Sequence, residues 1–179
     1  MTGRERVLFR AGTFNVVEAG YGRGEKRFTK RFVDYGPRVA GALPILDDGR
    51  LVLVRQYRYP IGRWIYGLPG GKVGKGESMI DGARRELREE TGYRAKRMRL
   101  IMRTYAAPGL LRQSPWSIYI ATGLTQDTRM LELDEDIEVK RITLKNALSW
   151  IYEGRIRDLG TIAAILRYSG HSRPRYDSL

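Results

Sequence analysis

The chain has 179 residues, with no cysteine and a single histidine, His171. The absence of cysteine excludes disulfide bonds, thiolate catalysis and zinc-finger sites. One histidine near the C-terminus excludes most mechanisms that depend on imidazole groups. Any metal-binding or general-base chemistry must therefore use carboxylates.

Long apolar segments are also absent. No run approaches the roughly 18 apolar residues that a membrane-spanning helix needs, and the N-terminus lacks the basic and then apolar pattern of a signal peptide. The hydrophobic fraction is 42% and the charged fraction 30%, values that are typical of a soluble globular protein. We expect a cytoplasmic protein with no membrane partner.

Basic residues dominate the charge. Lys and Arg number 33 against 20 Asp and Glu, which gives a net charge of +13. Such a charge is found in proteins that bind nucleic acid or another polyanion. The basic residues are spread along the chain, however, and form no block interleaved with aromatics. We therefore favour a solubilising surface that attracts small anionic substrates, and keep RNA as the less favoured partner.

Residues 71–93 are the most informative segment. On a helix of about 100° per residue, Glu86, Glu89 and Glu90 fall within one arc of roughly 100°. A neighbouring arc is apolar and predicts the side on which the helix packs; it contains Ile80, Ala83 and Leu87. The segment predicts a docked helix that presents three carboxylates to a cleft.

The alternative interpretation is a solvated acidic face on an Arg/Glu-rich helix. Adjacent glutamates repel unless a cation lies with them, and the neighbouring arginines supply this only in part. The segment 68–71, Leu-Pro-Gly-Gly, also predicts a sharp turn that leads into this segment. A solvated helix needs no such turn, so we favour a functional cluster.

The spacing of this segment resembles the Nudix box. The matching positions are Gly71, Glu77, Arg85, Glu86, Leu87, Glu89, Glu90 and Gly92, followed by Tyr93 where an aliphatic residue is commoner. The resemblance implies an α/β fold, a Nudix-type α/β/α sandwich with a mixed sheet, to which this chain adds N-terminal β-strands. It also implies a pyrophosphatase.

Carboxylates without His or Cys favour a hard divalent cation, Mg²⁺, for which Mn²⁺ can substitute. Such an ion can polarise a phosphoryl oxygen and lower the pKa of a bound water. The resemblance implies as metal ligands the Gly70 carbonyl oxygen, Glu86, Glu89 and Glu90, with Glu89 also catalytic. The box residues with a structural role would be Gly71, Glu77, Arg85 and Gly92, and we expect Glu77 and Arg85 to bond to each other.

Motifs outside the box resemble the ADP-ribose pyrophosphatase subfamily over about residues 14–170. They are the segments 54–60, 68–71, 134–139, 154–158 and 161–164 and the pair Pro108-Gly109, whose proline follows Tyr93 by fifteen positions. The resemblance implies hydrolysis of ADP-ribose to AMP and ribose 5-phosphate.

In that subfamily, Arg58 would contact substrate phosphate, and Pro108 and Gly109 would shape the terminal ribose pocket. A loop carboxylate, Glu135 ahead of Glu132 and Asp134, would orient or deprotonate the attacking water. The alternatives are a surface arginine at Arg58 and a solvated acidic turn at 132–136.

Two departures concern the sugar side of the substrate. The subfamily commonly has Glu and Ala where this chain has Gly67 and Gly70, and it has a glutamate soon after Pro108-Gly109 that is missing here. Another nucleoside diphosphate sugar therefore stays open as substrate. RNA 5′ ends form a second alternative. A non-hydrolysing module that binds ADP-ribose or nucleic acid is disfavoured, because such modules usually lack acidic residues of the box and none is missing here.

We expect three parts in the chain. They are an N-terminal β-hairpin extension at 1–36 that forms a homodimer, a Nudix hydrolase domain at 37–170 and a tail at 171–179. Residues 1–12 read as a loose lead, and strands at 14–18 and 27–35 as a hairpin. A second hairpin is predicted from 39–46 and 51–57, because Asp48-Gly49 is a strong turn signal. Further strands are predicted at 99–105, 116–122 and 137–142, and helices at 144–153 and from about 158 to 168.

Overall fold

A computed structural model describes residues 2–131 and 136–170. Its strands are β1 (Thr2–Ala11), β2 (Phe14–Arg23), β3 (Lys26–Tyr35), β4 (Arg38–Pro44), β5 (Leu51–Arg58), β6 (Arg63–Gly67), β7 (Gly70–Val73), β8 (Tyr93–Thr104), β9 (Leu111–Arg112), β10 (Trp116–Gln126) and β11 (Ile137–Ile142). Its helices are α1 (Met79–Thr91), α2 (Leu144–Tyr152) and α3 (Leu159–Gly170), with a 3₁₀ turn η1 (Tyr59–Ile61). The chain divides into two compact units, 1–38 with 105–115, and 39–104 with 116–179.

The first unit is a four-stranded sheet in the order β1-β2-β3-β9. The prediction that residues 1–12 are a loose lead is wrong, because residues 2–11 form β1 and pair antiparallel with β2. The register shifts between Val7 and Phe9. This irregularity explains why the apolar run Val7-Leu8-Phe9 does not alternate as a strand should. The predicted hairpin of β2 and β3 is confirmed, with longer strands than expected.

Ion pairs join the strands of this first sheet. Glu18 of β2 accepts hydrogen bonds from Arg6 at 3.0 Å and from Arg31 at 2.9 Å. Arg112 of β9 bonds to Asp34 of β3 at 2.7 Å and stacks over the Phe32 ring at 4.8 Å. The side chain of Arg112 thus adds to the backbone pairing that joins the short strand β9 to β3.

The second unit contains two sheets, ordered β7-β4-β10-β8 and β11-β5-β6. The prediction of a hairpin between 39–46 and 51–57 is wrong beyond its turn. Only one bridge, Ile45 to Leu51, joins the two segments. Strand β4 then runs parallel to β10, whereas β5 pairs antiparallel with β6 and β11. Because β10 also pairs antiparallel with β8, the predicted mixed sheet is confirmed.

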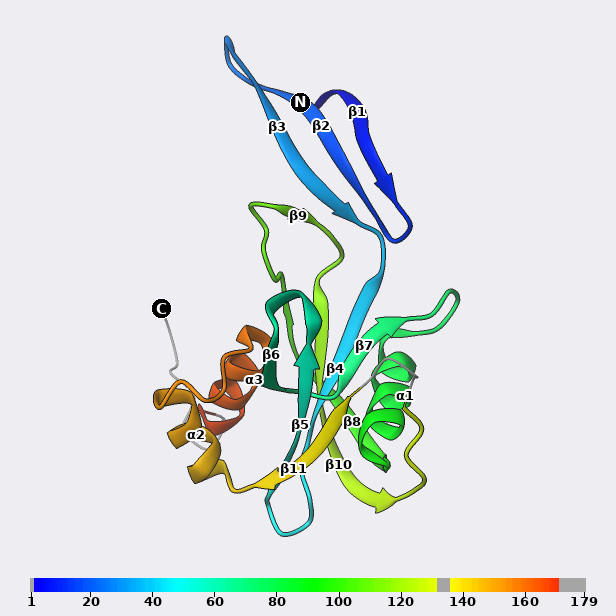
Figure 1. Cartoon of the computed structure of the whole chain (residues 1–179), viewed down its shortest axis with the longest axis vertical. Coiled ribbons are helices and arrows are strands. Elements are labelled where there is room, and N and C mark those ends of the chain that lie inside the picture. Colours follow the sequence, from blue (N-terminus) through cyan, green and yellow to red (C-terminus); the bar gives the residue numbers. More distant parts are fainter. Residues whose placement is uncertain (1, 132–135, 171–179) are drawn as a thin grey trace. The chain divides into compact units, whose positions relative to one another are not determined.

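Helices cover both faces of these strands, α1 on one side and α2 with α3 on the other (Figure 1). The alternation of side chains along a strand explains the arrangement. In β4, Ala42 packs in one core cluster with Leu87 of α1, while the next residue, Leu43, packs in another with Ile165 of α3. The α/β/α sandwich is therefore confirmed.

The predicted C-terminal helices are confirmed as α2 and α3. Thr143 caps α2, since its side chain accepts a hydrogen bond from the backbone N–H of Asn146 at 3.2 Å. Across residues 2–131 and 136–170, no helix combines the length and the apolar character that crossing a membrane requires.

Candidate active site

Helix α1 has well-defined ends. The Ser78 hydroxyl accepts a hydrogen bond from the Asp81 N–H at 3.2 Å, which satisfies one of the free donors of the first turn. Gly92 ends the helix with a left-handed φ of 70°, and its N–H donates to the Arg88 carbonyl at 2.8 Å. A Cβ on Gly92 would lie 2.9 Å from the Asp127 carbonyl oxygen. Both the conformation and the close contact therefore require glycine.

The helix buries apolar and acidic side chains together. Ala83 and Leu87 are completely inaccessible, and the Glu86 and Glu90 residues are only 9% and 3% exposed. Glu89 is partly exposed, with 32% of its side chain accessible. Carboxylates so deeply buried are costly unless they are paired, hydrogen-bonded or bound to a metal.

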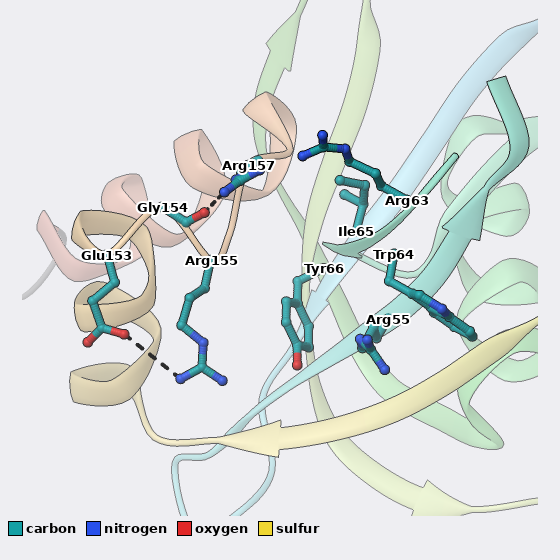
Figure 2. A pocket seen from close by; sticks show the side chains of 9 residues that line it. All are labelled: Arg55, Arg63, Trp64, Ile65, Tyr66, Glu153, Gly154, Arg155 and Arg157. Carbon is teal, nitrogen blue, oxygen red and sulfur yellow. Dashed lines mark hydrogen bonds and ion pairs between the residues drawn. The ribbon is translucent and has the colours of Figure 1, made fainter. Parts of the chain in front are cut away.

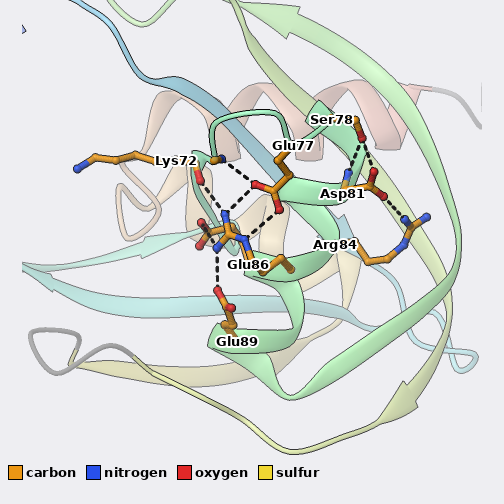
Figure 3. Close-up of polar contacts among 9 residues, drawn as sticks. Lys72, Glu77, Ser78, Asp81, Arg84, Glu86 and Glu89 are labelled. Carbon is orange, nitrogen blue, oxygen red and sulfur yellow. Dashed lines mark hydrogen bonds and ion pairs between the residues drawn. The ribbon is translucent and has the colours of Figure 1, made fainter. Parts of the chain in front are cut away.

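Arg85 connects three acidic residues of this segment. These are Glu77, Glu86 and Glu89, whose side chains lie close together in Figure 3. Arg85 donates to Glu77 at 3.0 Å, to Glu86 at 3.0 Å and to Glu89 at 2.8 Å. It also donates to the Lys72 carbonyl at 2.8 Å. The hydrogen bond to Glu77 and then those to Glu89 and Glu86 raise the pKa of Arg85 above its usual value. The contact expected between Glu77 and Arg85 is present, and it joins the loop after β7 to the helix.

Two glycines let strand β7 approach its neighbours closely. A Cβ on Gly71 would lie 2.7 Å from both carboxylate oxygens of Glu86. A Cβ on Gly70 would lie 2.6 Å from the Gly41 Cα in β4 and 2.7 Å from the Ala40 carbonyl oxygen. The Gly70 N–H donates to Glu90 at 3.1 Å. Glycine at position 70, where the resemblance led us to expect alanine, is thus explained by its contact with β4.

A cleft of about 520 Å³ opens over this part of the second unit. Its lining residues are Gln56, Tyr57, Arg58, Tyr59, Pro60, Gly70, Gly71, Lys72, Val73, Gly74, Arg85, Glu86 and Glu90. The cleft brings Arg58 from the end of β5 to the same cavity as Glu86 and Glu90 of α1. Helix spacing predicted that Glu86 and Glu90 share one face, and the resemblance added Arg58 to their site.

Arg129 belongs to the surroundings of this site and was missed. Its Nε donates to the Glu90 carbonyl at 2.6 Å, and its guanidinium also bonds to the Ile137 carbonyl at the start of β11. The Met130 N–H donates to the Glu89 carbonyl at 3.0 Å. Two carbonyl groups in the last turn of α1 thereby receive hydrogen bonds from the segment after β10. The sequence contains no motif around Arg129 that would have indicated this contact.

Thr161 of α3 was expected only as part of a motif. Its side chain is fully buried and accepts a hydrogen bond from the Leu68 N–H at 2.9 Å. It donates to Asp158 at 2.5 Å. Leu68 begins the turn that leads into Gly70 and Gly71. The two hydrogen bonds of Thr161 therefore join this turn to α3.

The remaining predicted site residues belong to the first unit or lie outside the described residues. Pro108 and Gly109 form an exposed turn in the first unit, where the Leu110 N–H donates to the Ala107 carbonyl at 3.0 Å. Glu135, with Glu132 and Asp134, lies outside the described residues. The roles assigned to these residues stay predictions.

Glu77, Glu86 and Glu89 are arranged around Arg85, whereas Glu90 accepts a hydrogen bond from the Gly70 N–H. Within the described part of the chain, no three His, Cys, Asp or Glu side chains form a group that could hold a metal as they stand. The donor set nevertheless fits a hard divalent ion. It consists of carboxylate oxygens, two of them from buried residues, and Gly71 has no Cβ to shield Glu86.

The NUDIX domain model matches residues 36–160. The chain belongs to the Nudix family. It is 35% identical over 139 residues to the "ADP-ribose pyrophosphatase" of Bacillus subtilis, covering 76% of this chain and 75% of that protein. It is 34% identical over 139 residues to the "Methanol dehydrogenase activator" of Bacillus methanolicus, covering 76% of this chain and 75% of that protein. A crystal structure of an "ADP compounds hydrolase" shares the fold with a TM-score of 0.86 at 20% identity, covering 96% of this chain and 92% of that one.

These similarities confirm the predicted family and the predicted enzyme class. The chain is a Nudix hydrolase related to ADP-ribose pyrophosphatases, and members of this family generally use divalent metal ions. The relatives carry different names, so membership alone does not decide the substrate.

Proposed function

We propose that this Nudix protein hydrolyses the diphosphate bond of ADP-ribose to AMP and ribose 5-phosphate, with Mg²⁺ as the preferred metal. The observation that carries the proposal is the shared cleft of Arg58, Glu86 and Glu90. It combines a guanidinium suited to phosphate with buried carboxylates suited to a divalent cation. The names of the Bacillus subtilis and Mycobacterium tuberculosis relatives support the choice of substrate.

Glu86, Glu89 and Glu90 would hold the metal together with the Gly70 carbonyl. The ion would supply charge stabilisation at a phosphoryl oxygen and a bound water of lowered pKa. Arg58 and Lys72 line the cleft and are exposed, so both can reach the diphosphate of a bound substrate. Glu135 would orient or deprotonate the attacking water, and Pro108 with Gly109 would bound the ribose pocket.

The test is turnover of a panel of nucleoside diphosphate compounds by the purified protein. With Mg²⁺ we expect AMP and ribose 5-phosphate from ADP-ribose, loss of turnover in EDTA, and recovery when Mg²⁺ or Mn²⁺ is restored. Glu90→Gln should lower kcat by about 10² or more, because it removes a proposed metal ligand. Full activity of Glu90→Gln would contradict the mechanism.

A second candidate substrate is another nucleoside diphosphate sugar. Gly67 and Gly70 replace residues that the subfamily commonly has beside the box, and Gly70 is set by its contact with β4. The same panel decides between the two, since cleavage of a different sugar nucleotide with no release of AMP from ADP-ribose would select this candidate.

We also propose that the first unit forms a homodimer. Strand β1 is at the end of its sheet and exposes Val7, Leu8 and Phe9, and Phe28 of β3 is exposed in the same sheet. An edge strand with exposed apolar side chains is suited to pairing with a second copy. Light scattering should give twice the chain mass, and Phe9→Asp should give the monomer. A monomer for the unsubstituted protein would contradict the proposal.

A further inference from the structure

The second unit has another cleft, of about 590 Å³, that shares no lining residue with the first (Figure 2). It lies between strand β6 and the segment that joins α2 to α3. Its lining residues are Arg55, Arg63, Trp64, Ile65, Tyr66, Glu153, Gly154, Arg155 and Arg157. Four of these are arginines and two are aromatic. The Nudix box contributes none of them.

Three aromatic rings and two arginines stack in a row beside this cleft. We call this row the arginine ladder, and it consists of Trp64, Arg55, Tyr66, Trp150 and Arg155. The Arg55 guanidinium lies over the Trp64 ring at 4.6 Å and over the Tyr66 ring at 6.0 Å. Tyr66 contacts Trp150 of α2 at 4.9 Å between ring centroids, and Arg155 lies over Trp150 at 3.9 Å. Stacked contacts of this kind stabilise the side chains that make them. The ladder is therefore ordered before any ligand binds.

The positive charge of the cleft is only partly balanced. Arg55 pairs with Glu138 at 3.2 Å, and Arg155 with Glu153 at 3.8 Å. Arg157 donates to the Gly154 carbonyl at 2.6 Å, which neutralises no charge. The Arg63 side chain makes no hydrogen bond or ion pair within residues 2–131 and 136–170. Among the described residues, no carboxylate therefore pairs with the exposed Arg63 or Arg157, an arrangement that favours an anionic ligand.

The hydrogen-bond donors of the cleft indicate which class of anion it would bind. A guanidinium presents a planar fork of N–H groups that matches phosphate oxygens. The outer face of the Arg155 guanidinium is accessible, since 49% of its side chain is exposed. Planar bases stack on guanidinium groups as they do on aromatic rings. A ligand that carries both a phosphate and a base would use both features.

We propose that this cleft is a second nucleotide-binding site, in which Arg63 and Arg157 hold a phosphate and the base stacks on Arg155 and extends the arginine ladder. The nucleotide is either free or part of a single strand of RNA, because the recognised chemistry is the same. The site does not depend on the substrate proposed for the first cleft. Arg58 and Arg63 are opposite each other in the β5–β6 register and line different clefts, so the pair separates the two sites experimentally.

Tryptophan fluorescence reports on this cleft directly. The chain has three tryptophans, and Trp64 and Trp150 both belong to the ladder. In a Trp116→Phe background all the tryptophan emission comes from the ladder. The full-length protein is titrated in EDTA with AMP, with a 5′-phosphorylated oligoadenylate and with inorganic phosphate.

We expect saturable quenching of the tryptophan fluorescence, by AMP if the ligand is a free nucleotide and by the oligonucleotide if it is an RNA strand. Arg63→Gln and Arg157→Gln should each weaken it about tenfold, the loss expected for one charge-assisted hydrogen bond. Arg58→Gln, in the first cleft, and Arg103→Gln, on β8, should leave it unchanged. The rate of substrate hydrolysis by Arg63→Gln should equal that of the Trp116→Phe protein in which it is made. Thermal melting checks that each variant is folded.

Three results would overturn the proposal. The first is binding that survives Arg63→Gln and Arg157→Gln. The second is binding that is lost with Arg58→Gln instead, which would place the nucleotide in the first cleft. The third is inorganic phosphate binding as tightly as both nucleotides, which would leave no role for a base. A tighter complex with the oligonucleotide than with AMP would identify the strand as the source.

Discussion

The Cβ position of Gly71 lies 2.7 Å from both carboxylate oxygens of Glu86. Substitution by alanine would therefore force this buried carboxylate away from strand β7. A shift of about 1 Å at a catalytic group can cost about 10² in rate, so we expect Gly71→Ala to lose activity on that scale. Its kcat is measured beside that of Gly20→Ala in β2, where an added Cβ meets nothing within 4 Å. Equal activity of the two variants would contradict the role given to Gly71.

Arg85 should matter for stability as well as for activity. It bonds to Glu77, Glu86 and Glu89, and its loss leaves a buried carboxylate with one partner fewer. We expect Arg85→Gln to lower the free energy of unfolding by about 1–3 kcal/mol in chemical denaturation. Arg85→Lys should recover only part of this, since a single ammonium cannot replace the guanidinium fork.

The preceding residue provides the control. Arg84 pairs with Asp81 at 2.7 Å, with both side chains largely exposed. A surface pair of this kind contributes about 0–1 kcal/mol. Arg84→Gln should therefore remain close to the unsubstituted protein in both stability and kcat. If Arg84→Gln and Arg85→Gln behave alike, the contacts of Arg85 with the acidic residues are not what stabilises the segment.

The link between Thr161 and the turn before the box gives a third prediction. Thr161→Val keeps the shape but leaves the Leu68 N–H and the Asp158 carboxylate without this hydroxyl. We expect a loss of about 1–3 kcal/mol in the free energy of unfolding. Activity should fall as well, because Leu68 leads into Gly70 and Gly71. Thr161→Ser retains the hydroxyl and should recover most of both quantities, whereas equal losses in the two variants would indicate packing instead.

The sequence indicated the parts of the fold that local chemistry determines. Thr143 and Gly92 delimit helices because caps act on adjacent backbone groups, and the spacing of Glu86 and Glu90 places both on one helical face. The pairing of β4 was not local. Its partner β10 lies more than seventy positions away in register, from Ala40 to Ser117, while the turn at 47–50 favoured the nearby β5.

In the candidate site, too, the contacts within one motif could be predicted and the contacts between distant segments could not. Glu77 and Arg85 were expected to bond because both lie in one motif, and they do. Arg129 and the arginine ladder could not be expected, since each depends on side chains from elements that are distant in sequence. Arg55 and Trp150, for example, share the ladder although they are in β5 and α2. No spacing rule connects such residues before the fold is known.

A last prediction concerns acid pH and the segment that follows β10. Asp127 bonds to Arg94, and this hydrogen bond, followed by one from the Thr128 N–H, holds the pKa of Asp127 below its usual 3.8. A carboxyl group with a lowered folded-state pKa contributes stability at pH values above its unfolded pKa of about 3.9. That contribution is lost as the pH falls through the folded-state pKa.

The difference in unfolding free energy between the unsubstituted protein and Asp127→Asn should therefore be constant above about pH 5 and shrink below about pH 4. Denaturant unfolding at a series of pH values measures it. A matched series with Asp47→Asn controls for general acid effects, because Asp47 is an exposed turn carboxylate. A difference for Asp127→Asn that stays constant down to pH values well below 4 would show that the ionised carboxylate does not hold this segment against the end of α1.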